Sequence, residues 1–210
     1  EIGVRLVGSE MCIRDSYWDV SSGTIKIGGV PVTELQTENL SDLTAFVFQD
    51  VFLLEDTLLE NIRMGTDATE EQVRQAAKAA QIDDFIMSLP KGYATRIGDE
   101  GVKLSGGQQQ RISIARAILK DAPIVVFDEA TSYSDIENEH KIQLALQNLL
   151  RGKTTIMIAH RLHTIRNADK IVVFQDGKVI EQGTHDELIA SGSTYSHMWD
   201  TYTRETIGEE

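Results

Sequence analysis

Helix-like and strand-like patterns of apolar residues follow one another along most of the chain. From Val73 to Ala80 the apolar residues recur every three or four positions, after a capping signal made by Thr69 and Gln72. This pattern predicts a helix over 69–80. The same spacing, with proline and glycine as stop signals, predicts further helices at 57–64, 82–89, 106–120, 138–150 and from 186 onward.

Short apolar runs bounded by turn residues predict the strands. They lie at 24–27, 45–48, 124–127, 154–159, 171–175 and 178–182, the last two joined by an Asp-Gly turn. The run at 124–127 is typical of a buried parallel strand, and the runs at 154–159 and 171–175 are expected to be buried strands as well. Strands and helices alternate in the second half, which predicts an α/β fold, while 50–120 is expected to form a mostly helical lobe.

Composition and charge exclude several classes of protein. The 210 residues suffice for one domain, or two small ones, with a buried core. Lys+Arg total 20 against Asp+Glu 33, a formal net charge of −13 that argues against a nucleic-acid partner. The single cysteine, Cys12, excludes an internal disulfide and a multi-cysteine metal site. The apolar runs are too short to span a bilayer and no signal-peptide pattern is present, so we expect a cytosolic location.

The segment Leu104-Ser-Gly-Gly-Gln108 precedes the predicted helix at 106–120. Adjacent glycines let a backbone approach a ligand closely, and Ser105 can cap the helix. The start of a helix offers free N–H groups and positive potential to an anion. The segment therefore suits phosphate binding, although an ordinary Ser-Gly-Gly helix entry has the same composition.

Polar side chains follow three of the predicted strands. Asp128 and Glu129 end the run at 124–127, His160 ends the next strand, and Gln49 follows 45–48. Ligands of open parallel sheets lie beyond the carboxyl ends of the strands, where an Asp can hold Mg²⁺ beside phosphate oxygens. A neighbouring strand would place His160 beside Glu129. The alternatives are an Asp that caps a turn and a histidine with a purely structural hydrogen bond.

With these residues the sequence resembles the ATP-binding cassette (ABC) transporters. Leu104–Gln108 is similar to their signature motif, and Ile124–Glu129 to their Walker B motif with its catalytic glutamate. Gln49 matches the Q-loop glutamine and His160 the switch histidine. The D-loop corresponds to 132–135, although Tyr133 and Ser134 depart from the small and apolar residues usual there. Tracts similar to the exporter branch lie at 60–62, 89–92, 98–101 and 181–185.

The resemblance implies a P-loop NTPase-like (RecA-like) parallel sheet with an inserted α-helical subdomain. The ATP-binding domain would span 17–210, with the helical subdomain at 51–119 and the core at 17–50 and 120–190. Two such domains would pair head to tail around two ATP molecules. They would serve transmembrane domains at the cytoplasmic face of a membrane, without a nucleic-acid partner.

The resemblance also implies a role for each matching residue. Asp128 and Gln49 would hold Mg²⁺, and Glu129 would be the general base for the attacking water. His160 would contact the γ-phosphate. The remaining ATP-binding residues, directed to the ATP held by the partner domain, would be Ser105, Gly106, Gly107, Gln108 and Asp135.

The phosphate loop of the family, Gly-x-x-x-x-Gly-Lys-[Ser/Thr], is absent from the sequence. Gly152-Lys-Thr154 lacks the first glycine and lies between a predicted helix and a strand, the reverse of the required order. The loop belongs just before Tyr17. We therefore expect 1–16 to be a non-native segment joined to a truncated cassette that binds ATP weakly and hydrolyses it negligibly.

Three functions compete for this sequence. The first is the ATP-hydrolysing domain of an exporter-type ABC transporter. The second is a degenerate cassette that hydrolyses no ATP and donates its signature motif to a partner, although Glu129 and His160 argue against it. The third is a soluble ABC ATPase unconnected with transport, which the net charge of −13 disfavours where the target is nucleic acid.

Overall fold

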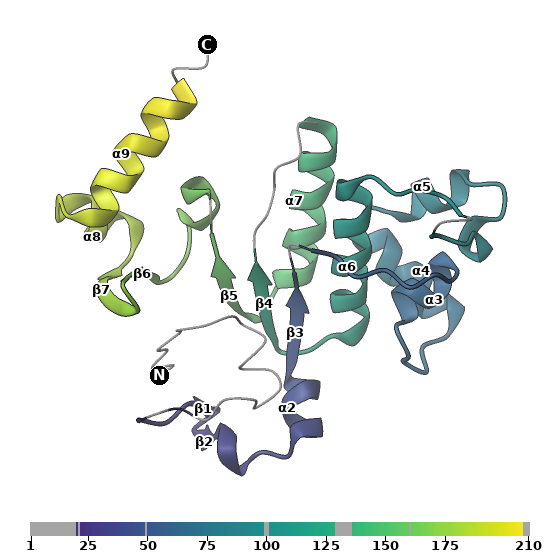
Figure 1. Ribbon diagram of the computed structural model, residues 1–210, viewed down its shortest axis with the longest axis horizontal. Helices are drawn as coiled ribbons and strands as arrows, with labels where there is room; N and C mark the ends of the chain where they lie inside the picture. The colour runs from purple at the N-terminus through teal and green to yellow at the C-terminus, as the bar shows by residue number, and fades with distance from the viewer. Residues whose placement is uncertain are drawn as a thin grey trace. The chain divides into compact units, whose positions relative to one another are not determined.

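The computed structural model describes residues 20, 22–48, 50–98, 101–128, 136–159 and 161–207 (Figure 1). The chain divides into two compact units. One comprises Ser41–Ile158, and the other is formed by the described residues of 1–40 and 159–210. No helix in the described part of the chain is long and apolar enough to cross a membrane.

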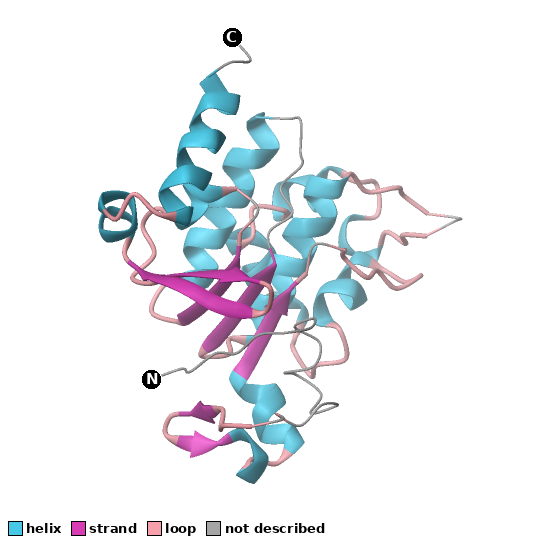
Figure 2. Cartoon of the chain, turned by 60° about the vertical axis from the view of Figure 1, so that its left-hand side comes forward, coloured by secondary structure: helices cyan, strands magenta, loops and turns pink. Residues whose placement is uncertain are grey.

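A parallel sheet lies at the centre of the Ser41–Ile158 unit (Figure 2). Its strands are β3 (Thr44–Val47), β4 (Ile124–Asp128) and β5 (Thr154–Ile158), in the order β3-β4-β5. Val47, Phe127 and Met157 lie at the same level of the three strands. Val125 and Phe127 are buried while their neighbours are half-exposed, so β4 alternates between a covered and a less covered face.

Helices cover this sheet and share one hydrophobic core with it. The longest are α6 (Gly106–Lys120) and α7 (Ile136–Leu150), which lie side by side. α6 also packs against β3 and against the shorter helices α3 and α4. The remaining elements of this unit are α3 (Leu58–Arg63), α4 (Glu70–Ala79), α5 (Asp83–Ser88) and the 3₁₀ turn η2 (Gly92–Ala94). The division into a helical subdomain and a core stays a prediction, because helix and sheet residues of this unit form a single cluster.

Local capping explains where several helices begin. Thr69 caps α4 and makes the expected reciprocal hydrogen bonds with Gln72. Ser105 and Gln108 do the same at the start of α6. The predicted capping signal at 69–80 is therefore confirmed, and both pairs satisfy N–H groups that a helix start leaves open.

The 159–210 part of the other unit contains an antiparallel ribbon and two helices. β6 (Ile171–Gln175) and β7 (Lys178–Gly183) pair through the expected Asp-Gly turn, whose φ angles are 50° and 71°. The 3₁₀ turn η3 (Leu162–Ile165), α8 (His185–Ala190) and α9 (Thr194–Ile207) complete this part. Its core consists of Leu162, Ile171, Val173, Leu188 and Tyr195.

Two predicted strands are less buried than expected. In β6, Val172 is 39% and Phe174 is 37% exposed, and in β5 the first two residues are exposed. The expectation that both runs are buried strands was therefore wrong. β5 lies at an edge of the described sheet, and β6 is covered on only one face, by residues such as Leu188. Apolar runs of this length do not reveal how many faces are covered.

A short hairpin precedes the sheet in sequence. Its strands β1 (Lys26–Ile27) and β2 (Val30–Pro31) are antiparallel, and the expected turn is made by Gly28 and Gly29 with φ angles of 58° and 85°. These positive angles favour glycine. The 3₁₀ turn η1 (Val32–Glu34) and helix α2 (Thr37–Leu43) follow.

Candidate functional site

The segment Ser105–Gln108, here called the signature turn, begins the 15-residue helix α6. The Ser105 N–H donates to Gln108 Oε1 at 2.9 Å, and Ser105 Oγ accepts from the Gln108 N–H at 3.4 Å. The N–H groups of Gly106 and Gly107 belong to the first helical turn and have no intrahelical acceptor. Together with the positive end of the helix, they suit an anionic ligand.

Gly107 also permits a close approach of α7. A Cβ atom at position 107 would lie 3.3 Å from both Cβ and Cγ of Asn138, and 3.5 Å from its Oδ1. Gly107 is buried at this contact. Helix packing therefore gives a reason for glycine here that is independent of any ligand.

Asp128 ends β4, where its partner on β5 is Ile158. Its side chain is partly exposed, and its carboxylate makes no hydrogen bond or ion pair with any residue that the structure describes. Carboxylate oxygen is the type of ligand that Mg²⁺ prefers, and Mg²⁺ commonly takes one or two carboxylates with water and phosphate oxygens. Asp128 thus fits a magnesium ligand. The described residues contain no group of three or more metal-ligating side chains.

The other predicted site residues Gln49, Glu129, Asp135 and His160 lie outside the described residues. The structure does place the strands that precede three of them. β3, β4 and β5 are parallel neighbours and end at Val47, Asp128 and Ile158. The expected adjacency of the 124–127 and 154–159 strands is therefore confirmed, while the positions of the four side chains stay predictions.

A polar network ties α6 to the chain that follows β3. Arg116 donates through Nε to the Asn61 carbonyl at 2.6 Å, through Nη1 to the Phe52 carbonyl at 2.6 Å, and through Nη2 to Asn61 Oδ1 at 3.1 Å. Burial lowers the pKa of Arg116 to about 10, so this side chain is charged at neutral pH. The helix that presents the signature turn is thus fixed to the segment that begins three residues after Gln49.

The sequence motifs gave no indication of this network. In the sequence Arg116 is one residue of the helix predicted at 106–120, and Asn61 lies within the exporter-like tract at 60–62. Asn61 is completely buried, and it also binds the Leu54 N–H, the Leu54 carbonyl and the Thr57 carbonyl. The available signal was that Asn61 and Arg116 are polar residues at helix positions where the spacing pattern predicts apolar ones.

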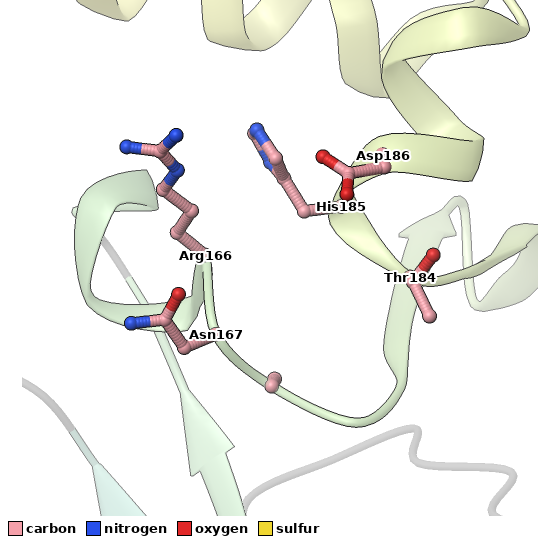
Figure 3. A pocket seen from close by; sticks show the side chains of 6 residues that line it. Arg166, Asn167, Thr184, His185 and Asp186 are labelled. Carbon is pink, nitrogen blue, oxygen red and sulfur yellow. The ribbon is translucent and has the colours of Figure 1, made fainter.

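A cavity of about 270 Å³ lies between the segment 166–168 and the start of α8 (Figure 3). Arg166 projects from one side of it and His185 from the other. The His185 ring is held by Tyr195, whose hydroxyl is 2.9 Å from Nδ1, and by an edge contact with Trp199. None of the predicted site residues lines this cavity, and we do not assign the nucleotide to it.

Comparisons with known proteins agree with the motifs. Residues 11–132, more than half of the chain, match the family described as "ABC transporter". An ATP-dependent lipid A-core flippase of Legionella pneumophila (strain Paris) is 49% identical over 195 residues, which cover 92% of this chain and 33% of the relative. A putative multidrug export ATP-binding/permease protein of Bacillus subtilis (strain 168) is 50% identical, covering 87% of this chain and 32% of the relative.

A solved structure supports the same assignment. A bacterial Atm1-family ABC exporter with ATP bound has a TM-score of 0.82 and 40% sequence identity to this chain, over 91% of this chain and 34% of the exporter. The expected α/β fold of P-loop NTPase type is therefore confirmed. The chain spans about a third of the length of the curated relatives that it matches. From the match over 11–132 and these similarities, we conclude that the chain belongs to the ABC transporter family.

Proposed function

We propose that this chain is the ATP-binding and ATP-hydrolysing domain of an exporter that drives transport across a membrane. One observation carries the proposal: β3, β4 and β5 are parallel neighbours. The three strands that precede Gln49, Glu129 and His160 therefore end at the same edge of the sheet. The capped signature turn lies in the same unit. In a nucleotide site shared by two domains, one domain would contribute the strand ends and the other domain its signature turn.

In this proposal the carboxyl end of β4 carries the chemistry. Asp128 and Gln49 would hold Mg²⁺, which when bound neutralises phosphate charge. Glu129 would accept a proton from the water that attacks the terminal phosphorus, as the bond to the bridging oxygen breaks and ADP and phosphate form. His160 would orient the terminal phosphate.

The signature turn would act on the partner's nucleotide. Ser105, Gly106, Gly107 and Gln108 would bind the terminal phosphate of ATP held by a second nucleotide-binding domain, with Asp135 at the contact between the two domains. The pair would be joined to transmembrane domains at the cytoplasmic face of the membrane. We propose 17–210 as the cassette, with 51–119 as its helical subdomain and 17–50 and 120–190 as its core.

Restoring the missing phosphate loop tests the catalytic assignment. The chain as written should hydrolyse ATP negligibly, because it lacks the N–H groups and lysine that hold the β- and γ-phosphates. Replacing 1–16 by a segment that supplies the strand, the Gly-x-x-x-x-Gly-Lys-Ser loop and the helix that follows it should produce hydrolysis. Glu129→Gln in that variant should abolish it while ATP still promotes dimers, and Glu71→Gln, on the exposed face of α4, is the matched control.

Near-normal turnover after Glu129→Gln would contradict the catalytic assignment, because it would remove this glutamate from the mechanism. Robust hydrolysis by the unaltered chain would leave the ATPase proposal standing and contradict the expectation that the missing loop prevents turnover. Phosphate release is measured with the purified proteins and Mg²⁺ present and absent.

A second function is favoured by one observation, the fully formed signature turn in a chain without a phosphate loop. The chain would then complete the ATP site of an intact partner domain. Mixing it with a cassette that has a phosphate loop but a disrupted signature motif should restore hydrolysis by that cassette. Ser105→Arg in this chain should prevent the restoration. The substitution removes the Ser105 hydroxyl, and the larger arginine side chain blocks the N-terminus of α6.

A further inference from the structure

A second cavity lies in the Ser41–Ile158 unit, away from the predicted nucleotide site. Its volume is about 440 Å³, within the range of small-molecule sites. It lies between the start of α4 and the stretch that links α5 to η2. The side chains that decide its chemistry are Glu70, Arg74, Met87, Leu89, Lys91 and Tyr93.

Arg74 has unused hydrogen-bonding capacity at this cavity. Its Nε atom is buried and has no hydrogen-bond partner among the described residues. The guanidinium carbon lies 5.9 Å from the centre of the Tyr93 ring. The buried Nε is closed to solvent and so to a ligand, whereas the terminal nitrogens of this half-buried side chain make no hydrogen bond or ion pair with a described residue. An arginine fork is shaped to bind a planar carboxylate through two parallel hydrogen bonds, and these terminal nitrogens would form them here.

Tyr93 is held rigidly as one wall of the cavity. Its hydroxyl donates to Asp83 Oδ1 at 2.6 Å, and both residues are buried. Burial, the first cause, and the hydrogen bond with Asp83 raise the pKa of Tyr93, so the phenol stays neutral. Asp83 is engaged by this bond and does not line the cavity.

The lining as a whole combines apolar surface with one net positive charge. Met87 is 53% exposed and Leu89 is half-buried, and they offer an apolar surface beside the charged groups. Arg74 and Lys91 are cationic while Glu70 is anionic. A single net charge suits a monoanion, whereas a phosphate dianion would keep one charge uncompensated beside Glu70.

We propose that this cavity binds a small amphipathic monocarboxylate. The carboxylate pairs with the Arg74 guanidinium, Lys91 adds a second cation at the rim, and the aliphatic body covers Met87 and Leu89. The site uses none of the residues assigned to ATP. The proposed carboxylate site is therefore independent of the proposed function, and each can be tested without the other.

The test uses octanoate as probe with the full 210-residue chain. Calorimetry should show one site per chain, and NMR shifts should concentrate at 70–94. Arg74→Met, which keeps the aliphatic stem, should weaken binding roughly 10- to 100-fold, the effect expected for a hydrogen bond to a charged group. Lys78→Met, one turn further along α4 and exposed, is the matched control and should bind normally.

Three comparisons decide the outcome. Octylamine, with the same body and the opposite charge, should not bind, and acetate, which lacks the body, should bind far more weakly. Equal affinity of the wild-type chain and Arg74→Met would overturn the proposal, provided that circular dichroism shows the variant folded. So would octanoate shifts outside 70–94, or binding of an acidic leucine-rich peptide where octanoate fails, since the occupant would then be a protein segment.

Discussion

Replacement of Asn61 by alanine tests whether its polar network holds the segment after β3. The Asn61 side chain is completely buried and makes four hydrogen bonds. Oδ1 accepts from the Leu54 N–H at 2.8 Å and from Arg116 at 3.1 Å, while Nδ2 donates to the carbonyls of Leu54 and Thr57, both at 3.0 Å. Alanine removes all four.

The expected loss follows from the burial of these partners. Each net hydrogen bond contributes about 1 kcal/mol, and the loss rises where a partner is left unpaired away from water. The segment around Leu54 is half-buried, so water replaces part of what is lost. Arg116 keeps its bonds to the carbonyls of Asn61 and Phe52. We therefore expect Asn61→Ala to lower the free energy of unfolding by about 3 kcal/mol.

The assay combines urea unfolding, followed by circular dichroism, with native-state hydrogen exchange of the Leu54 amide. Exchange reports local opening and needs no assumption that the two units unfold together. The matched control is Asn148→Ala, which removes one exposed bond, to the Ala79 carbonyl at 2.8 Å, and should cost less than about 1 kcal/mol. Equal losses for the two variants, or unchanged exchange at Leu54, would refute the reasoning.

Two further predictions concern a glycine and a glutamate. Gly107→Ala gains about 1 kcal/mol of helix propensity. Its Cβ would lie 3.3 Å from Asn138, and such overpacking costs about 1–3 kcal/mol. Urea unfolding should therefore show a lower free energy of unfolding for the variant. A stabilised variant would contradict this packing. Glu181 accepts from the Thr194 and Tyr195 N–H groups, and these bonds, first that of Tyr195, lower its pKa from the ordinary 4.5. The stabilisation is therefore present above pH 4.5 and is lost as the pH falls through the folded pKa. The protection factors of the amides at the start of α9, which are corrected for the intrinsic pH dependence of exchange, should fall in that acid range. Glu181→Gln should remove most of this pH dependence.

Local patterns were sufficient to predict most helices and strands of this chain. The Thr69 and Ser105 caps form as their spacing with Gln72 and Gln108 predicts, because a capping box needs only residues three positions apart. The Gly28-Gly29 turn is equally local. Burial of β5 and β6 was predicted wrongly because it depends on which elements cover each face, and no short window of sequence contains that information.

The candidate site was predictable only in its individual motifs. Asp128 could be placed at a strand end from the run before it. The contact of Gly107 with Asn138 joins residues from two helices, and the bonds of Arg116 to Phe52 and Asn61 join residues more than fifty positions apart. Such contacts follow from packing, for which the amphipathic pattern gives the face of a helix but not its neighbour.

The contacts that hold the signature turn bear on the choice between the two proposed functions. Its cap from Gln108, its packing against Asn138 and the anchoring of α6 through Arg116 all lie within the Ser41–Ile158 unit. None of them involves the segment where the phosphate loop belongs. Loss of that loop therefore removes the chain's own phosphate cradle and leaves intact the surface offered to a partner's ATP. Consequently the loop graft and the restoration of a partner's hydrolysis are independent experiments, and a chain that fails the first can still succeed in the second.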